Sequence, residues 1–559
     1  MTGEADMSED MNTCTPRTDC TETCGEQDDG CGGTLDCGAC ACSDGLPTGD
    51  TSCGTCGLGQ LSCAEGETGP GTCEQHELGE GVALPATACS ALFHVAEGAD
   101  ANSADGSKES PFPLISDALD AARNTPGAVV LVSDGDYAES GLSVPDGTSL
   151  LGGMNQDFAF DGSLPTITVS AKGADTTVGI DVSDHNEVAY LGYLTLITED
   201  VPADHSNVGA RIFNAGDLTI THLDVTAGAG GAGQDGVDGM DGDDGGQGED
   251  AQDAIRGGIE VIGGRSFNGA FPGTSGQNPG CPEANGGGGG VGARASVNDS
   301  NGAMPARHEA QPGFDTTGAF GGQAGTEAGV SNGGDGTTAS AGAPGMAGTS
   351  GSASGQFEMG YWIQDGDGTD GAAGTFGYGG GGGGGTYWPS DTDQDFGDIP
   401  GGSGGGGGAG GCGGQAGTAG KKGGSSMGLL VVSSDGLTII DSSFASSTGG
   451  QGGAGGRGGR GGDGADGGIG TTHYKISTGS SSRTPHTLTA GVGGKGGDGG
   501  IGGDAGSGAG GASFGGLCEA SRVTLVGEVN FTAAAAGSGG QGRVSAPNGR
   551  SEDQTNCVQ

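Results

Sequence analysis

The chain has little of what most globular domains are built from. Only 32% of its 559 residues are hydrophobic and 4% are aromatic, which is below the usual composition of a soluble domain. Lys and Arg number 19 against 71 Asp and Glu, so the formal net charge is −52. Nucleic acids and anionic membranes are bound by clusters of Lys and Arg. The composition therefore argues against both partners and favours a hydrated surface or cation binding.

Long hydrophobic segments are absent as well. No run of 18 or more apolar residues occurs, so we expect no membrane-spanning segment. The first residues are acidic and polar, without the hydrophobic stretch of a signal peptide. Yet the chain has 16 cysteines, and twelve of them lie between Cys14 and Cys89, a density typical of oxidising compartments. We therefore expect an extracellular or cell-surface protein whose chain is a mature or truncated form.

Residues 1–88 are predicted to form an acidic head held together by disulfides, because few apolar residues are available for a core. Zinc is the alternative. The pairs Cys37-x-x-Cys40 and Cys53-x-x-Cys56 have the spacing of a zinc ribbon, and four thiolates would complete a tetrahedral site. Eight further cysteines in the same segment would then stay unexplained. Disulfides are therefore favoured, and their pairing is left open.

The head also resembles a known type of module. The segment from Cys24 to Cys40, with Asp29-Gly30-Cys31-Gly32-Gly33 at its centre, is similar to a small Cys/Gly module of proteins secreted by myxobacteria and their relatives. The segment Cys53-Gly54-Thr55-Cys56-Gly57, with Cys63 and Cys73, looks like a second module of that kind. The resemblance implies an extracellular context and no particular activity.

A pattern of short strands recurs at a fixed spacing. Gly209 and Gly428 are each followed after nine positions by an aliphatic residue, Thr and Ile, and after seven more by another apolar residue. The matching residues are Leu218, Thr219, Ile220 and Val225 in one copy and Leu437, Thr438, Ile439 and Phe444 in the other. Gly515 begins a copy one residue shorter, and Gly179 begins a fourth with the nine-residue step to Val188. Repeated strands that cannot bury their faces alone predict a stacked β-solenoid, with the Gly209 copy directly on the Gly428 copy.

A helix is predicted near the start of this region. Ile115, Ala118, Leu119 and Ala122 form one apolar stripe at helical spacing, and Ser116 is the expected N-cap. A buried strand should follow at 129–132, since all four of its residues are aliphatic.

This order of elements resembles the opening of right-handed parallel β-helix proteins of the pectin-lyase-like superfamily. The matching segments are Gly98-x-Asp100, Gly106-Ser107, Pro111-Phe112, Gly135-x-Tyr137 and Leu151-Gly152-Gly153, together with the apolar stripe of the helix. The resemblance spans residues 90–226 and implies an all-β fold. It also implies that the helix caps the open end of the first coil, where unpaired strand edges would otherwise be exposed.

The remainder of the chain alternates between repeat copies and glycine-rich insertions. Both insertions leave the repeat at the same position, so we expect them to project from one side of the solenoid. The expected segments are 89–226 for the cap helix and first rungs, 227–424 for the large insertion, 425–447 for a further rung, 448–511 for a second insertion, and 512–559 for the last rung and C-terminal tail.

Glycine recurs at every third residue in three runs, 230–248, 452–470 and 494–506. A period of three is that of polyproline II geometry, and the absence of proline from these runs argues against collagen. Fixing a glycine backbone costs about 1–2 kcal/mol per residue, with no side chain to offset it. Order therefore requires that neighbouring runs exchange backbone hydrogen bonds in a polyglycine-II-like bundle. A disordered, hydrated brush is an equal alternative.

A bundle of this kind leads to two further predictions, one about its cysteines and one about its side chains. Cys281 and Cys412 lie in the large insertion and could staple it. The non-glycine residues should point outward, with acidic and basic rows that can face one another, among them Asp238, Asp241, Arg457 and Arg460.

Both tryptophans stand beside a tyrosine in the large insertion, at Tyr361-Trp362 and Tyr387-Trp388. Such pairs can fill a small local cluster, or they can present a stacking platform for sugar rings or a partner surface. The composition is similar in texture to certain phage adhesins, whose polyglycine lattices present aromatic receptor-binding loops. By that resemblance Tyr361, Trp362, Tyr387 and Trp388 are candidate ligand-contact residues, held at tips far from the solenoid.

Catalytic and metal sites are not indicated. Polysaccharide lyases on the resembling fold need stacked acids to hold calcium and an Arg or Lys as base. The acids near strand ends are Asp181, Asp184, Asp217, Asp224, Asp435 and Asp441. Alignment of the copies sets Asp217 against Gly436, Asp224 against Ser443 and Arg211 against Leu430, so the acids do not stack and no cation lies clearly among them. We predict no catalytic residue, cofactor or resident metal. Loosely bound Ca²⁺ is the minor alternative to a solvated acidic face, at Asp235, Asp238, Asp241, Asp243 and Asp244.

The sequence therefore predicts a non-catalytic, secreted or surface-displayed β-helix protein that is adhesin-like or a structural component of the envelope. Its partner would be a surface polysaccharide or another envelope protein. The alternative is a carbohydrate-active enzyme on the same fold, either a polysaccharide lyase or a glycoside hydrolase. The ligand, the disulfide connectivity and the oligomeric state are not determined by the sequence.

Overall fold

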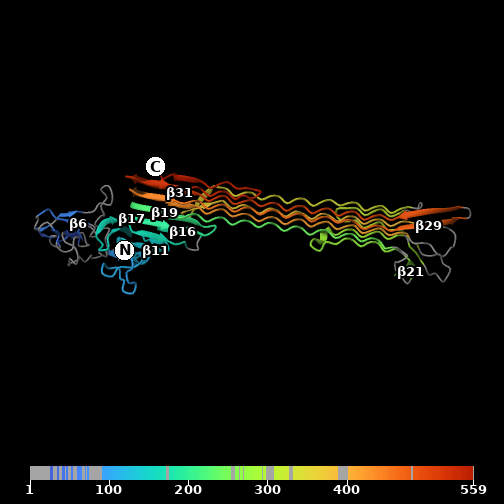
Figure 1. Cartoon of the computed structure of the whole chain (residues 1–559), viewed down its shortest axis with the longest axis horizontal. Helices are drawn as coiled ribbons and strands as arrows, with labels where there is room; N and C mark the ends of the chain where they lie inside the picture. The colour runs from blue at the N-terminus through green and yellow to red at the C-terminus, as the bar shows by residue number, and fades with distance from the viewer. Residues whose placement is uncertain are drawn as a thin grey trace, which may run out of the picture.

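The structure is a computed structural model of the chain (Figure 1). It describes residues 91–559 except for 172–174, 253–258, 263–264, 269, 293, 297–306, 326–330, 388–400, 480–481 and 558–559. Of residues 1–90 it describes residues 63–65 and eight short strands: β1 (Glu26–Asp28), β2 (Thr34–Asp36), β3 (Ala41–Ser43), β4 (Leu46–Pro47), β5 (Ser52–Cys53), β6 (Gly59–Ser62), β7 (Gly69–Pro70) and β8 (Thr72–Glu74). Cys63, a described residue of the head, is in a disulfide. The pairing of the head's cysteines and the zinc prediction lie outside the residues whose side chains the structure describes.

Two sheets of mostly parallel strands form what we call the body. One sheet has the path β32-β27-β19-β17-β13-β10-β9 with shorter strands beside it, and the other has the order β12-β16-β18-β26-β31-β34. The strands are β9 (Ala91–Val95), β10 (Ala128–Ser133), β11 (Asp136–Glu139), β12 (Leu142–Val144), β13 (Ser149–Met154), β14 (Phe160–Ser163), β15 (Thr166–Val169), β16 (Thr176–Ser183), β17 (Ala189–Thr198), β18 (Ser206–Phe213), β19 (Leu218–Ala227), β26 (Ser426–Val432), β27 (Asp435–Ile440), β28 (Ser443–Ser446), β31 (Ser513–Glu519), β32 (Arg522–Val526), β33 (Asn530–Thr532) and β34 (Ser551–Thr555). The prediction of an all-β chain is confirmed.

The predicted stacking of the two clearest repeat copies is confirmed. Three pairs of residues from these copies stand directly opposite one another in parallel register: Ile212 with Val431, Ile220 with Ile439, and Val225 with Phe444. The shorter copy continues the stack, because Leu437 stands opposite Val523. Segments separated by two hundred residues of insertion therefore belong to one stack.

The fourth copy was predicted one residue out of register. The structure pairs Ala189, and not Val188, with Leu218. Val188 is 45% exposed, whereas Ala189 is buried. The turn between β16 and β17 is one residue longer than the turn between β18 and β19, so the step from Gly179 to the buried position is ten residues and not nine.

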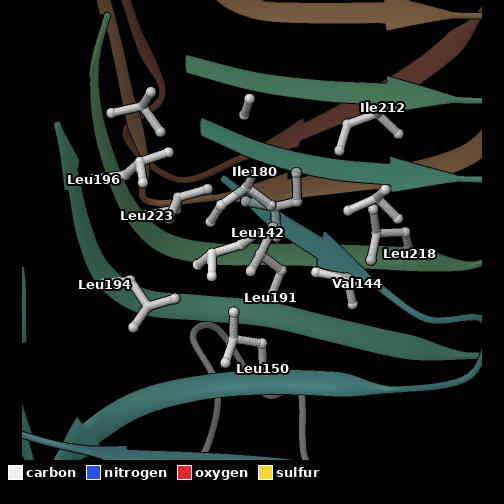
Figure 2. Packing of buried hydrophobic residues seen from close by; sticks show 14 of the residues in the cluster. Leu142, Val144, Leu150, Ile180, Leu191, Leu194, Leu196, Ile212, Leu218 and Leu223 are labelled. Carbon is white, nitrogen blue, oxygen red and sulfur yellow. The ribbon is translucent and has the colours of Figure 1, made fainter. Parts of the chain in front are cut away.

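Aliphatic side chains fill the space between the two sheets (Figure 2). Leu142 and Ile180 from one sheet meet Leu150 and Leu191 from the other, and all four are at most 2% exposed. Burial of each such side chain contributes about 1.5–3 kcal/mol. The alternation of apolar and polar residues along the strands has thus directed one face of each sheet into a common core.

Helix α1 (Ile115–Ala122) lies against β9, β10, β11 and β12. Its predicted apolar stripe is confirmed, since Ile115, Ala118, Leu119 and Ala122 are all buried. The predicted N-cap is wrong. Leu114 is the N-cap residue and makes no side-chain bond; instead, Glu139 Oε1 accepts hydrogen bonds from the backbone N–H groups of Ile115 and Ser116. A carboxylate from a neighbouring strand satisfies the N-terminal donors of the helix.

A bundle of extended glycine-rich runs, which we call the shaft, leaves the body on one side (Figure 1). Its six long runs are 228–250, 331–354, 365–387, 401–425, 447–471 and 490–512. Shorter runs lie among them, and Cys281 and Cys412 form the predicted disulfide staple beside the short helix η3 (Pro282–Ala284). At about 3.1 Å per residue, a run such as 228–250 spans roughly 70 Å.

The runs are joined by backbone hydrogen bonds at every third residue, as the bundle prediction requires. Gly236 N–H donates to Ala454 C=O, and Gly499 N–H donates to Gly462 C=O. These bonds link the three glycine runs identified in the sequence side by side. The alternative of a disordered brush is therefore wrong for these runs.

Run 401–425 illustrates how the lattice is satisfied in three directions. Gly407, Gly408 and Ala409, three consecutive residues, donate their N–H groups to three different neighbours. The acceptors are the carbonyl oxygens of Gly287, Gly494 and Gly246, respectively. Each turn of such a run can therefore bond to several surrounding runs, as a threefold extended helix permits.

Glycine is required wherever another run occupies the direction of the side chain. A Cβ added at Gly381, Gly382 or Gly383 would lie 1.9–2.1 Å from a carbonyl oxygen of a different neighbouring run. The nearest oxygens belong to Phe320, Gly288 and Gly491. The stretch 379–385 is glycine throughout, and the shorter runs lie against this part of the shaft. The number of glycines per turn thus reflects how many neighbours surround a run.

Candidate functional sites

The far end of the shaft carries β-hairpins, which we call the distal hairpins. Four strands form one sheet in the order β20-β21-β22-β23, and β29 and β30 form another. Their bounds are β20 (Ile259–Ile262), β21 (Arg265–Asn268), β22 (Arg294–Ser296), β23 (Arg307–His308), β29 (Thr472–Gly479) and β30 (Ser482–Thr489). Figure 1 shows β21 and β29 at the same end of the molecule, far from the body.

A further hairpin, which we call the base hairpin, joins runs 331–354 and 365–387 at the opposite end of the shaft. It consists of β24 (Gly355–Glu358) and β25 (Tyr361–Gln364). Met359 and Gly360 both have positive φ, as a tight two-residue hairpin turn requires. The turn also depends on a missing side chain, because a Cβ on Gly360 would lie 2.5 Å from the ring of Phe213.

The base hairpin places Trp362 against the body, which corrects the prediction that this residue lies at a distant tip. The Trp362 ring packs edge-on against Phe514 of β31 and against Phe357 of β24, with centroid distances of 6.0 and 5.2 Å. Its indole Nε1 is buried and has no hydrogen-bond partner. The tryptophan thus fills a local apolar cluster, the alternative that the sequence left open.

Tyr361 contacts a buried arginine. The Arg211 guanidinium lies 4.1 Å from the centroid of the Tyr361 ring, and it also donates to the Met359 carbonyl. On its other side Arg211 forms a two-pronged ion pair with Asp181, at 3.1 and 3.0 Å, and donates to Ser183. Arg211 is only 6% exposed. Arg211 of β18 therefore bridges Asp181 of β16 in the body and the base hairpin of the shaft.

This arginine was not recognised as the partner of an acid. The comparison of repeat copies set it against Leu430, which the register confirms. The copy on the other side, beginning at Gly179, sets Arg211 opposite Asp181, and that alignment was available in the sequence. The statement that no cation lies clearly among the acids is therefore wrong for Arg211.

Of the remaining aromatic candidates, Tyr387 ends the shaft run 365–387 at the end away from the base hairpin. Tyr387 is 8% exposed, and its N–H donates to the Ser331 carbonyl, so little of its surface is open to a ligand. Trp388 lies outside the described residues. Tyr387 shares no site with Tyr361 and Trp362, which lie at the other end of run 365–387.

Besides Asp181, three of the six acids considered for catalysis accept hydrogen bonds within the body. Asp184 accepts a hydrogen bond from the Asn214 amide, Asp224 from the Ser443 hydroxyl, and Asp441 from the Glu528 N–H. As predicted, Asp224 stands opposite Ser443 and not opposite another acid. Among the described residues, no group of three or more His, Cys, Asp and Glu could hold a metal ion.

Four of the five acids considered for calcium, all except Asp243, form a ladder along the shaft together with Asp250. Oδ1 atoms of run 228–250 accept backbone N–H groups of run 447–471 at 2.6–2.7 Å. The pairs are Asp235 with Ala454, Asp238 with Arg457, Asp241 with Arg460, Asp244 with Asp463, and Asp250 with Ile469. The four predicted outward residues are exposed. However, the carboxylates of Asp238 and Asp241 accept hydrogen bonds from backbone N–H groups of run 447–471. The aspartates at every third residue thus serve as acceptors for N–H groups that have no carbonyl acceptor on a neighbouring run.

One buried histidine stands out among the titratable groups of the body. His185 is fully buried, and its Nε2 accepts the N–H of Gly147 at 3.2 Å. Its Nδ1 has no hydrogen-bond partner and lies 4.0 Å from Asp146. Burial lowers the pKa of His185, although the charges of Asp146 and Glu187 oppose that shift. The imidazole is therefore held neutral.

The second disulfide, Cys518–Cys557, ties the C-terminal segment to β31.

Within the described part of the chain, no helix is long and apolar enough to span a bilayer. Comparisons of the chain with protein-family models, with curated proteins and with solved structures return no match.

Proposed function

We propose that the protein is a non-catalytic, adhesin-like surface protein whose shaft holds a binding end away from its point of attachment. In this proposal the body is a right-handed parallel β-helix, the shaft is a polyglycine-II lattice, and the chain works outside the cell. The partner is a surface polysaccharide or an envelope protein. The observation that carries the proposal is the collection of the distal hairpins at one end of a hydrogen-bonded shaft (Figure 1).

The geometry of the shaft supports presentation as its role. Its backbone bonds run in three directions from run 401–425, and such lateral bonding resists bending in each of them. Enclosing a ligand or building a catalytic pocket does not call for an extension of roughly 70 Å. Displaying hairpins beyond a crowded surface does.

The contacts of Arg211 support the non-catalytic part of the proposal. A lyase on this fold would need a free cation as base, but Arg211 is paired with Asp181 and covered by Tyr361 of the base hairpin. The two disulfides outside the head, Cys281–Cys412 and Cys518–Cys557, support an oxidising setting.

The test is an array of bacterial surface polysaccharides probed with the full chain and with a variant in which 472–489 is replaced by an Asn-Gly turn. We expect the full chain to bind at least one polysaccharide and the variant to bind it at least tenfold more weakly, with an unchanged melting temperature. Undiminished binding by the variant would count against the proposal. Release of shortened or unsaturated sugars would favour the enzyme instead.

A further inference from the structure

Two of the six long runs of the shaft do not continue into a strand of the body. The four that do are 228–250, which follows β19, 401–425, which leads into β26, 447–471, which follows β28, and 490–512, which leads into β31. Runs 331–354 and 365–387 instead end at the base hairpin, which joins them to each other. Their ends are therefore held beside the body by non-covalent contacts alone.

Backbone hydrogen bonds arrange the six runs in three layers of two. In order, the layers are 228–250 with 447–471, 401–425 with 490–512, and 365–387 with 331–354. The middle layer bonds to both of the others, since Thr418 N–H donates to Val237 C=O and Gly374 N–H donates to Gly414 C=O. The first layer continues the sheet that contains β19 and β28, and the middle layer continues the sheet that contains β26 and β31. The third layer continues no sheet of the body.

The base hairpin extends this third layer over the outer face of the sheet that contains β26 and β31. Val431 belongs to the core between the two sheets, so its neighbour Leu430 points to the outer face. Leu430 and Phe514 are nevertheless 0% exposed, and they belong to a cluster against which Trp362 and Phe357 of the hairpin pack. The hairpin thus overlaps the body beyond the point where the shaft ends.

The same hairpin is hydrogen-bonded to both runs of the middle layer. Gln364 Nε2 donates to the Gly510 carbonyl at 2.8 Å, and Lys422 Nζ donates to the Gln364 carbonyl at 2.7 Å. Gly510 and Lys422 lie close to the ends of runs 490–512 and 401–425, where these runs lead into β31 and β26. One hairpin is therefore bonded to the shaft and packed against the body.

We propose that the base hairpin makes the junction between body and shaft rigid, so that the shaft does not bend there. Parts of a chain that are joined by few contacts move relative to one another. Without the hairpin, the third layer would end at the junction, where threefold runs change into pleated strands. With the hairpin in place, this layer overlaps both parts and resists bending perpendicular to the layers. The inference goes beyond the proposed function, because it does not depend on what the distal hairpins bind.

Two substitutions should detach the hairpin from the body. Gly360 has a φ of +76°, and a Cβ on it would lie 2.5 Å from the Phe213 ring and 2.9 Å from Arg211 Nη1. Gly360→Val therefore places a side chain between the hairpin and the body. Trp362→Ser removes the ring that packs against Phe514.

Two matched substitutions should leave the hairpin in place. Gln356→Val adds the same side chain as Gly360→Val, but at an exposed position of the same hairpin. Trp362→Phe keeps an aromatic ring in the apolar cluster and removes the buried indole N–H, which has no hydrogen-bond partner. These variants separate the loss of the contact from the mere presence of a substitution.

The width of the distance distribution between two spin labels measures bending at the junction. Ser143 of β12 and Arg457 of run 447–471 are both exposed, one on the body and one on the shaft. Labels carried there by unnatural amino acids leave the native disulfides intact. We expect a narrow distribution in the unmodified chain, in Q356V and in W362F, and a roughly twofold broader one in G360V and W362S, as a hinge produces.

Amide exchange at 401–414 in each variant shows whether the lattice of the shaft is intact. An unchanged width in G360V and W362S, with these amides still protected, would overturn the proposal. Loss of protection in both variants would overturn it as well, because the hairpin would then be required for the lattice and not for the junction. Equal broadening in Q356V would also count against it. The measurement uses no ligand, so its failure is distinct from a failure of the proposed function.

Discussion

The body and the shaft both pair their backbone N–H and C=O groups with neighbouring segments, but their interiors are filled in opposite ways. In the body, strand pairing is accompanied by a core of aliphatic side chains such as Leu191 and Ile220, each at most 1% exposed. In the interior of the shaft there are almost no side chains, and a Cβ on Gly382 would lie 1.9 Å from the Gly288 carbonyl oxygen. The comparison shows that a dense interior can be specified by the residues it excludes as well as by those it packs.

The largest effect is expected where the body depends on a packed side chain. Phe444 is 1% exposed, stacks on Phe531 at 5.6 Å and stands opposite Val225. The Phe444→Ala substitution should lower the free energy of unfolding by about 3–5 kcal/mol, as measured by denaturant titration. Phe320 in the shaft is 73% exposed, so Phe320→Ala is the matched control and should change stability by less than about 0.5 kcal/mol. Equal losses would mean that packing does not distinguish the two regions.

The shaft should be sensitive to a side chain added between packed runs and not to a change of the exposed Arg457 side chain. A Cβ at Gly458 would lie 2.0 Å from the Gly502 carbonyl oxygen, so Gly458→Val should cost about 1–3 kcal/mol through overpacking. It should also open run 447–471 to proteolysis. Adjacent Arg457 is exposed, and Arg457→Val should leave proteolysis unchanged. Equal resistance of both variants would argue against close-packed runs.

The sequence predicted both regions because each has a period that its packing imposes. The nine-residue step from Gly209 to Leu218 located the stacked strands, and the three-residue glycine period located the lateral hydrogen bonds. The turn between β16 and β17 escaped prediction, since one added residue in a turn changes the register without changing the apolar pattern.

The position of the candidate ligand-contact residues was predicted less well, because it depends on which ends of the shaft runs lie beside the body. Trp362 was assigned to a tip, but it lies at the base. A signal was present in the sequence: runs 331–354 and 365–387 are nearly as long as run 401–425, which joins the body. Two runs of that length that start at the distal end must turn beside the body. By contrast, no rule based on residue spacing could predict that Glu139, at the end of β11, caps the N-terminus of α1.

A smaller effect is expected at the edge of the shaft, where the aspartate ladder replaces a missing neighbour. Asp238 Oδ1 accepts the Arg457 N–H at 2.7 Å. Asp238→Ala should cost about 0.5–1.5 kcal/mol and speed amide exchange at Arg457. Asp238→Asn keeps the acceptor oxygen and should restore most of the protection. If Asn behaves like Ala, the charge of the ladder matters more than its hydrogen bonds.

The smallest effect concerns pH and belongs to the body. The pKa of His185 is lowered by burial, so the unfolded chain takes up a proton on this residue at a higher pH than the folded chain does. Its contribution to stability is therefore complete above the ordinary pKa of about 6.5, and it is lost as the pH falls below that value. The melting temperature should drop between pH 7.5 and 5, and His185→Gln should show a shallower drop. Identical slopes would contradict a neutral, buried imidazole.

Hydrogen exchange at the glycine amides of 401–414 tests the central claim most directly. These residues have almost no side chains to bury, so only the lateral backbone bonds can protect them. If the shaft is a hydrogen-bonded lattice, these amides should exchange as slowly as those of β19 and β26 in the body. Exchange at the rate of an unstructured glycine peptide, with β19 and β26 still protected, would contradict it.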